Sequence, residues 1–239
     1  MTAAEVWQRF WDWTATRPSS AYVFRGQSKD RPIVPKIGRS VYQYSPALEL
    51  RMFRKFKSAA RAFLSFDPRD DWDWLALAQH HGAPTRLTDW SENPLVALYF
   101  AVSSSTGEID AVVYALDLDR PDLDKLDPES PVEERANLAG YPIPSPFSLR
   151  KGVLVLDSSA ITPRITAQRG VFTAHAKPED PIDVDLQDRF IVPAALSREV
   201  FSQLMELGID GLHIFPDLDG LCSSLEARYK NGVAFSALG

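Results

Sequence analysis

Apolar residues recur at two spacings along this chain, and each spacing predicts one kind of element. Spacings of three and four residues are typical of helices with one apolar face, and they occur in residues 5–13, 45–64, 75–82, 91–102, 197–207 and 218–229. Short apolar runs are typical of strands, and they occur at residues 22–26, 111–116, 153–156, 171–172, 188–192 and 211–215. The two kinds do not alternate strictly, so we expect an α+β fold: a single domain with a small mixed or antiparallel sheet flanked by helices.

The densest run of chemically capable side chains lies in residues 75–102. A helix-like segment ends near Gly82, Pro84 stiffens the following turn, and Ser91 is a suitable N-cap for a second helix. Residues 83–90, which include Thr85, Arg86, Asp89 and Trp90, are then predicted to be a short loop held between two helices. Binding and catalytic residues are concentrated on such loops, so we expect function here.

Residues 117–150 have a different composition from the rest of the chain. They are rich in Asp, Glu and Pro and contain few apolar residues. Such a segment can bury little apolar surface, so we expect a long surface excursion and the place where insertion or disorder is concentrated.

The net charge limits the kinds of partner that we expect, and the cysteine content and hydropathy limit the compartment. The chain of 239 residues has a formal net charge of −6, which argues against bulk electrostatic binding of nucleic acid or an anionic membrane. Residues 45–64 are nevertheless locally basic, which fits a solvated helix face or a local nucleic-acid contact. The single cysteine, Cys222, cannot form an internal disulfide, and its helical spacing favours a buried thiol. With no apolar run of about 18 residues and no signal peptide, we expect no membrane span and a cytoplasmic protein.

Several familiar catalytic and binding patterns are absent from the sequence. It contains no phosphate-binding loop, no dinucleotide-binding glycine motif and no nucleophile elbow. The adjacent His80 and His81 would point to different faces of a helix, and His175 and His213 add no ligand spacing. We therefore expect no metal site.

The remaining candidates are polar residues set between strongly apolar segments. Arginines with amide and hydroxyl donors suit a diphosphate, a tryptophan suits a planar ring, and a carboxylate suits positive charge developing on a sugar. We expect them to form a nucleotide or dinucleotide pocket, although Asp89 could instead pair with Arg86, and Trp90 could belong to the core. The candidate set is Arg25, Gln27, His80, Thr85, Arg86, Asp89, Trp90 and Gln168.

Several of these candidates lie in segments that resemble one known family, the FRG domain of bacteria and their phages. The resemblance is carried by Phe-Arg-Gly-Gln at residues 24–27, by residues 79–90 (QHHGAPTRLTDW) and by residues 93–101 (NPLVALYFA). Residues 168–173 and 215–221 also fit its pattern. The resemblance covers residues 20–230, which leaves an N-terminal helix in residues 1–19 and a tail in residues 231–239.

The order of elements is also similar to that of ADP-ribosyltransferases of the arginine–serine–glutamate kind. In them an early strand carries an arginine, and a Ser/Thr-rich segment precedes a helix, as Arg25 and residues 88–91 do here. This resemblance implies NAD as substrate, with Arg25, Thr85 and Arg86 on the diphosphate and Trp90 stacked on nicotinamide. Asp89 or Asp217 would stabilise the ribose, and His80 joins them as a catalytic candidate. The chain departs from the pattern because it has no late pair of glutamates and has Asp89 where a hydroxyl is expected.

Two hypotheses follow from these resemblances. In the first, the chain is an NAD-using ADP-ribosyltransferase or NAD glycohydrolase, acting on an unidentified macromolecular acceptor as a toxin or phage-defence effector. In the second, the same pocket belongs to a non-catalytic module that senses a nucleotide or nucleic acid. Nicotinamide release from NAD distinguishes the two.

Overall fold

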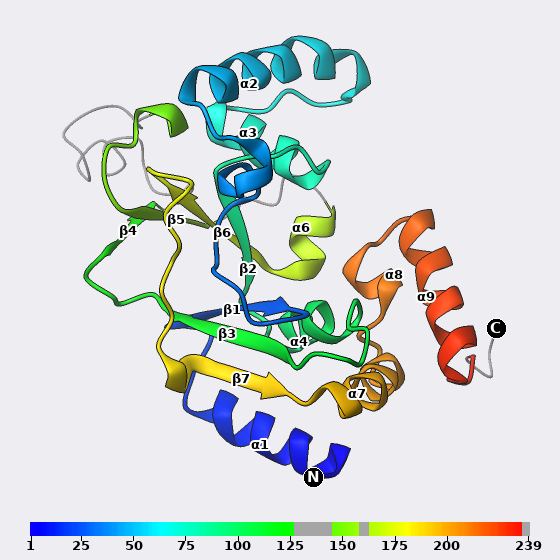
Figure 1. Cartoon of the computed structure of the whole chain (residues 1–239). Helices are drawn as coiled ribbons and strands as arrows, with labels where there is room; N and C mark the ends of the chain where they lie inside the picture. The colour runs from blue at the N-terminus through cyan, green and yellow to red at the C-terminus, as the bar shows by residue number, and fades with distance from the viewer. Residues whose placement is uncertain (127–144, 158–162, 236–239) are drawn as a thin grey trace.

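One mixed sheet runs through the part of the chain that the computed structural model describes, which is residues 1–126, 145–157 and 163–235 (Figure 1). Its strands are β1 (Tyr22–Gln27), β2 (Leu87–Ser91), β3 (Ala111–Asp117), β4 (Leu123–Leu126), β5 (Val153–Asp157), β6 (Gly170–His175) and β7 (Arg189–Val192). They lie in the order β4-β5-β6-β2-β1-β3-β7, and all neighbours are antiparallel except β4 and β5. With helices packed around this sheet, the predicted α+β class is confirmed.

The sheet consists of two halves that meet between β1 and β2. These strands are in register only at Phe24 and Ser91, whereas β1 pairs with β3 along its whole length. Figure 1 shows β1, β3 and β7 running across the direction of β2 and β6. The two central strands therefore diverge on either side of one pairing point, and their side chains can face a common space.

The helices form separate groups around these two halves. They are α1 (Ala3–Ala15), α2 (Pro46–Ala60), α3 (Asp71–His80), α4 (Pro94–Val102), α6 (Pro163–Gln168), α7 (Ala194–Glu206), α8 (Gly211–Ile214) and α9 (Leu218–Asn231). Short 3-10 turns occur at Lys36–Gly38, Ser40–Tyr42, Arg61–Phe63, Pro146–Ser148 and Leu186–Asp188.

Three hydrophobic clusters hold the helices and strands together. The largest packs α1, α4 and α7 on one face of β1, β3 and β7, with Phe10, Phe24 and Leu204 fully buried. A second packs α2 and α3 on β2, β5 and β6. The third covers the opposite face of the sheet and includes Val23 and Trp90. Phe24 and its neighbour Val23 enter different clusters because successive strand residues point to opposite faces.

Gly26 brings α4 unusually close to β1. A Cβ atom at this position would lie 1.8 Å from the carbonyl oxygen of Ala97 and 2.5 Å from the amide nitrogen of Ala101. Only a residue without a side chain fits there. The glycine therefore sets the distance between the buried central helix and the strand that carries Arg25.

The predicted loop at residues 83–90 is wrong in its second half, because residues 87–90 belong to β2. They pair in register with β6, from Leu87 opposite Ala174 to Ser91 opposite Gly170. The predicted N-cap at Ser91 is also displaced: α4 begins after Asn93, whose side chain accepts a hydrogen bond from the Leu95 amide at 3.0 Å. Sheet pairing with a distant segment decided the structure here, and this pairing has no local signal.

The predicted strand at residues 211–215 is a short helix, α8. Asp210 accepts hydrogen bonds from the amides of Leu212 and His213, both at 3.1 Å, and so starts a helix within an apolar run. Of the predicted excursion at 117–150, β4 and the turn at Pro146–Ser148 are described, whereas the prediction of insertion or disorder falls largely on residues 127–144, outside the described part. The same holds for residues 236–239 of the predicted tail. Cys222 is exposed rather than buried as its spacing predicted.

Candidate functional site

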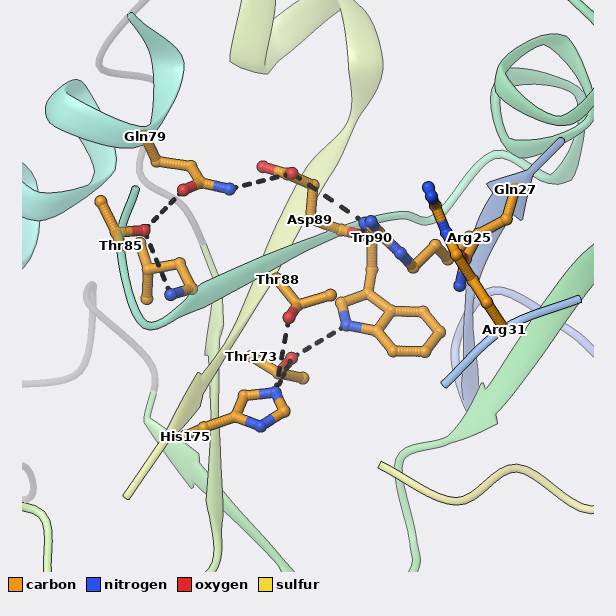
Figure 2. Close-up of polar contacts among 11 residues, drawn as sticks. Arg25, Gln27, Arg31, Gln79, Thr85, Thr88, Asp89, Trp90, Thr173 and His175 are labelled. Carbon is orange, nitrogen blue, oxygen red and sulfur yellow. Dashed lines mark hydrogen bonds and ion pairs between the residues drawn. The ribbon is translucent and has the colours of Figure 1, made fainter. Parts of the chain in front are cut away.

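A cleft of about 240 Å³ lies where the two halves of the sheet diverge, and we call it the Arg25 cleft. Its walls come from β1, β2, the end of α3, the start of β6 and one side of α4 (Figure 2). The residues that line it are Phe24, Arg25, Gly26, Gln27, Ser28, Arg31, Gln79, His80, Asp89, Trp90, Ser91, Val96, Ala97, Phe100, Ser104, Gln168, Gly170 and Phe172.

Arg25 crosses from β1 to β2 at the pairing point. Its Nη1 donates to the backbone carbonyl oxygen of Asp89 at 2.6 Å and lies 3.9 Å from Asp89 Oδ2. Its Nε is buried and has no hydrogen-bond partner within residues 1–126, 145–157 and 163–235. A guanidinium carries five N–H donors, and a buried donor without a partner costs free energy. Because Arg25 also lines the cleft, its guanidinium can contact a molecule that enters.

The electrostatic environment of Arg25 favours an anion. Burial lowers the pKa of its guanidinium, the charge of Asp89 opposes that shift, and Arg39 and Arg31 lower the pKa further. A cationic group that is desolvated and surrounded by other cations is stabilised when negative charge arrives.

Asp89 is held in place from the other side by α3. Gln79 Nε2 donates to Asp89 Oδ2 at 3.0 Å, and Gln79 Oε1 accepts from Thr85 Oγ1 at 2.5 Å. Thr85 Oγ1 accepts in turn from the Leu87 amide at 3.2 Å. Figure 2 shows this chain from Thr85 through Gln79 to Asp89 and Arg25. Because Thr85 donates to the oxygen of the Gln79 amide, the amide nitrogen must face the carboxylate.

The Asp89 carboxylate is the most accessible charged group of this chain of contacts. Its side chain is 55% exposed, compared with 17% for that of Arg25. Among the described residues that line the cleft, it is the sole carboxylate. The Arg25 guanidinium can bind an anionic group at one end of a ligand. The oriented, accessible Asp89 carboxylate can stabilise positive charge at the other end.

Gln27 and Arg31 form a second polar pair in the wall. Arg31 Nε donates to Gln27 Oε1 at 2.5 Å, and Gln27 is buried. Arg31 was not predicted from the sequence, since it lies in a segment that showed only loop signals. Gln79 was also missed, although it directly precedes His80 in the QHHG run.

His80 and Gln168 also line the cleft, as predicted. Gln168 Nε2 donates to the Ile214 carbonyl oxygen at 3.1 Å, and its own carbonyl oxygen accepts from Ser91 Oγ at 2.6 Å. The side chain thus connects the end of α6 to α8. The structure therefore gathers Arg25, Gln27, His80, Asp89 and Gln168 as the sequence predicted, while their roles stay predictions.

Arg86 does not belong to the cleft, and its predicted contact with a ligand is not supported by its position. Its Nε and Nη2 donate to the two carboxylate oxygens of Glu49 at 2.9 and 2.5 Å, and its Nη1 donates to the Pro146 carbonyl oxygen at 3.0 Å. Both side chains are buried. The alternative pairing of Arg86 with Asp89 is wrong as well, because the partner is Glu49, on α2.

Three more candidates lie at positions that do not fit their predicted roles: Thr85, Trp90 and Asp217. Thr85 is buried behind Gln79 and outside the cleft lining. Trp90 borders the cleft, but only 3% of it is exposed, and its Nε1 donates to Thr173 Oγ1 at 3.0 Å. It cannot stack on nicotinamide without leaving the core. Asp217 caps α9 by accepting from the Gly220 amide at 2.7 Å, and it is not among the lining residues.

Two further findings concern metals and membranes. Within residues 1–126, 145–157 and 163–235, no three His, Cys, Asp or Glu side chains gather in a way that could hold a metal ion. No helix in that part of the chain is both long and apolar enough to cross a bilayer.

Comparison with known proteins gives one match. Residues 20–108 match the model of the FRG domain. No curated protein and no solved structure matches the chain. The matched segment contains β1, α3, β2 and α4, and so contributes Arg25, Arg31, Gln79, His80 and Asp89 to the cleft. Gln168, Gly170 and Phe172 come from outside it and complete the wall.

Proposed function

We propose that the FRG domain carried by this chain binds NAD in the Arg25 cleft and uses it as a substrate for ADP-ribosyl transfer or hydrolysis. The proposal rests on the Arg25 guanidinium, which lines a cleft that also presents the Asp89 carboxylate and whose buried Nε has no partner among the described residues. A dinucleotide offers both complementary groups: a diphosphate for the guanidinium, and a ribose that gains positive charge as its bond to nicotinamide breaks.

The size of the cleft limits how much of the dinucleotide it can enclose. Ligand pockets that bury a drug-sized molecule usually measure about 300–1,000 Å³, whereas the Arg25 cleft measures about 240 Å³. We therefore place the nicotinamide ribose inside, with the diphosphate at Arg25 and Arg31 and the adenosine extending outward. Phe100 and Phe172 supply apolar lining for the ring in place of Trp90.

The proposed chemistry requires little beyond charge stabilisation. The bond between ribose C1′ and the nicotinamide nitrogen breaks, and its electron pair leaves with nicotinamide as a neutral molecule. An oxygen or nitrogen nucleophile, from water or from an acceptor, forms the new bond to C1′. Asp89 stabilises the cationic ribose between these events, and His80 takes the proton that the nucleophile releases. We also propose that the protein acts in the cytoplasm as a toxin or phage-defence effector. This part of the proposal rests on the family resemblance alone.

One observation favours a second candidate, the non-catalytic nucleotide-binding module. Asp89 Oδ2 already accepts a hydrogen bond from Gln79 and lies 3.9 Å from Arg25 Nη1. No other carboxylate is found among the described lining residues. A carboxylate that is already neutralised by neighbours stabilises a cationic sugar less effectively. In this candidate the same groups bind a nucleotide without breaking any bond.

Replacing Asp89 with Asn separates the two candidates. The change preserves shape and removes the charge, so a transferase or hydrolase should lose on the order of a hundredfold in nicotinamide release while NAD binding changes little. The exposed Asp67, outside the cleft lining, gives a matched control as Asp67→Asn. Nicotinamide release and NAD binding are measured on the wild type and both variants.

The outcomes distinguish the candidates clearly. Release by the wild type that depends on Asp89 supports the enzyme. Tight NAD binding without release, with water or with a cell lysate as acceptor, supports the module. Absence of NAD binding by the wild type contradicts the use of NAD altogether.

A further inference from the structure

One side chain from each of three adjacent strands forms a row on the face of the sheet that Arg25 occupies. Arg25 of β1 pairs in register with Tyr114 of β3, and Tyr114 pairs with Arg189 of β7. Directly opposed residues of an antiparallel pair point to the same face. Gln27 also lies on this face, because alternate residues of a strand do so. The four side chains therefore share one side of the sheet.

The loop that follows β1 is fastened to this row through Asp30. Tyr114 Oη donates to Asp30 Oδ1 at 2.7 Å and accepts from the Arg31 amide at 3.3 Å. Arg189 Nη1 donates to Asp30 Oδ2 at 3.3 Å. Arg189 is itself fixed, because its Nε and Nη2 donate to the Val184 carbonyl oxygen at 3.0 and 2.8 Å. The start of the loop is thus held against the sheet.

Arg31 reaches back from this loop to the wall of the cleft. Its Nε donates to Gln27 Oε1 at 2.5 Å, and Gln27 is buried, so the base of the guanidinium is fixed. Among the described residues, its two Nη atoms have no hydrogen-bond acceptor, and no carboxylate forms an ion pair with it. The adjacent carboxylate, Asp30, already has Tyr114 and Arg189 as partners. Arg31 therefore presents an oriented cation to the cleft.

Arg25 and Arg31 thus supply two separately held guanidinium groups to one cleft. Burial lowers the pKa of Arg25, and nearby cations that include Arg31 lower it further. Figure 2 shows Arg25, Gln27 and Arg31 together on the β1 side of the cleft. Their anchors, Arg25 itself and Gln27, are two positions apart, which is about 7 Å along a strand.

The anchoring bonds keep the two guanidinium groups apart. Arg25 is tied to the backbone carbonyl oxygen of Asp89, and Arg31 is tied to Gln27. Neither is free to converge with the other on one phosphate without breaking its bond. Two linked phosphates can instead accept from one arginine each, and arginine binds phosphate oxygens in pairs.

We propose that Arg31 makes the Arg25 cleft specific for ligands with two linked phosphates, and that Tyr114 positions Arg31 for this task. The link to NAD, which contains such a diphosphate, rests on the proposed function. Because the folded protein already holds the loop, a diphosphate does not have to order Arg31 as it binds, and that entropy cost is avoided. Monophosphates gain less, because Arg25 alone can bind their single phosphate.

The experiment compares ADP-ribose with AMP, which carry about two negative charges each near neutral pH but present two phosphates and one. Titration calorimetry gives the affinity of each nucleotide for the wild type, Arg31→Gln and Lys29→Gln. We expect Arg31→Gln to weaken ADP-ribose at least about tenfold and AMP less than about threefold. Lys29→Gln is the matched control and should change neither affinity, because Lys29 is an exposed cation of the same loop outside the cleft lining.

Tyr114→Phe tests the positioning role, because it removes the hydroxyl and keeps the ring. We expect the affinity for ADP-ribose to fall roughly fivefold, and we expect no further loss when the change is made in Arg31→Gln, where no guanidinium remains to be positioned. A purely structural role would lower the melting temperature and leave the affinity unchanged, or lower the affinity equally in both backgrounds.

The outcomes separate this inference from the use of NAD. Equal losses of ADP-ribose and AMP affinity in Arg31→Gln overturn the specificity, because they show an effect of charge alone. Unchanged ADP-ribose affinity in that variant, or a wild type that binds neither nucleotide, also overturns it. A Tyr114→Phe loss that persists without Arg31 overturns the positioning role. The expected ADP-ribose pattern in a protein that neither binds NAD nor releases nicotinamide supports the diphosphate specificity and contradicts the use of NAD.

Discussion

At the scale of single residues, the difference between Arg25 and Arg86 is decided by their surroundings. Both are arginines in family-like segments of the sequence. Arg86 has two carboxylate oxygens of Glu49 and a backbone carbonyl oxygen as partners in a buried setting. Arg25 lines the cleft, and its buried Nε has no partner in the part of the chain that the structure describes. The first arrangement fastens α2 to β2. The second leaves a guanidinium in the wall of the cleft, where a ligand can contact it.

Replacing Arg86 with Ala should therefore reduce stability and leave the cleft chemistry intact in the protein that remains folded. Removing one partner of a buried ion pair typically costs about 3–5 kcal/mol, because the other charge stays buried. Urea unfolding at neutral pH measures the loss. Arg51→Ala, at an exposed position of α2, is the control and should change the free energy of unfolding little. If Arg86→Ala lowers the free energy of unfolding by less than about 1 kcal/mol, the ion pair with Glu49 does not stabilise the fold as proposed.

At the scale of elements, strand β6 and its neighbour β2 enclose a histidine that must stay neutral. Burial lowers the pKa of His175 to about 4, and the positive charges of Arg25 and Arg86 act in the same direction while Asp180 opposes them. Its Nε2 lies 3.4 Å from Thr88 Oγ1. In the unfolded chain the pKa of histidine is about 6.5, so the unfolded state binds a proton at a pH where the folded state does not.

This difference predicts how stability changes with pH. The contribution of neutral His175 is complete above about pH 6.5 and is lost as the pH falls toward 4, by roughly 1.4 kcal/mol per pH unit. Urea unfolding at pH 7.5 and pH 5.0 should show a loss in the wild type that is about 2 kcal/mol larger than in His175→Gln. Equal losses in both proteins would mean that His175 titrates normally when folded.

The elements also show what the sequence could and could not reveal. The helices with one buried face and the strands at residues 22–26 and 111–116 were predictable, because burial leaves a periodic pattern. Strand β2 was not, since its pairing with β6 joins segments far apart in the sequence. That pairing points Asp89 toward the cleft and buries Trp90 in the core, so two neighbouring candidates lie in different environments. Glu49, the partner of Arg86, carried no signal within its helix.

At the scale of the whole molecule, the Arg25 cleft depends on how the sheet divides. The single register point between β1 and β2 lets the two halves diverge. Gly26 brings α4 against β1, and side chains of α4 complete the wall of the cleft. The segment that matches the FRG domain ends before β3, yet the cleft is also lined by Gln168 at the end of α6 and by Gly170 and Phe172 of β6. The site is therefore a property of the complete fold.

The most direct test of this account is the affinity of NAD for the wild type and for Arg25→Lys, measured by titration calorimetry at fixed ionic strength. Lysine keeps the positive charge but lacks the Nε donor and the planar fork that can meet a diphosphate at two points. We predict that NAD binds the wild type and that Arg25→Lys binds it at least about tenfold more weakly, with a melting temperature close to that of the wild type. The exposed Arg51→Lys should bind NAD as the wild type does. A wild type that does not bind NAD, or an Arg25→Lys variant with unchanged affinity, would contradict the account.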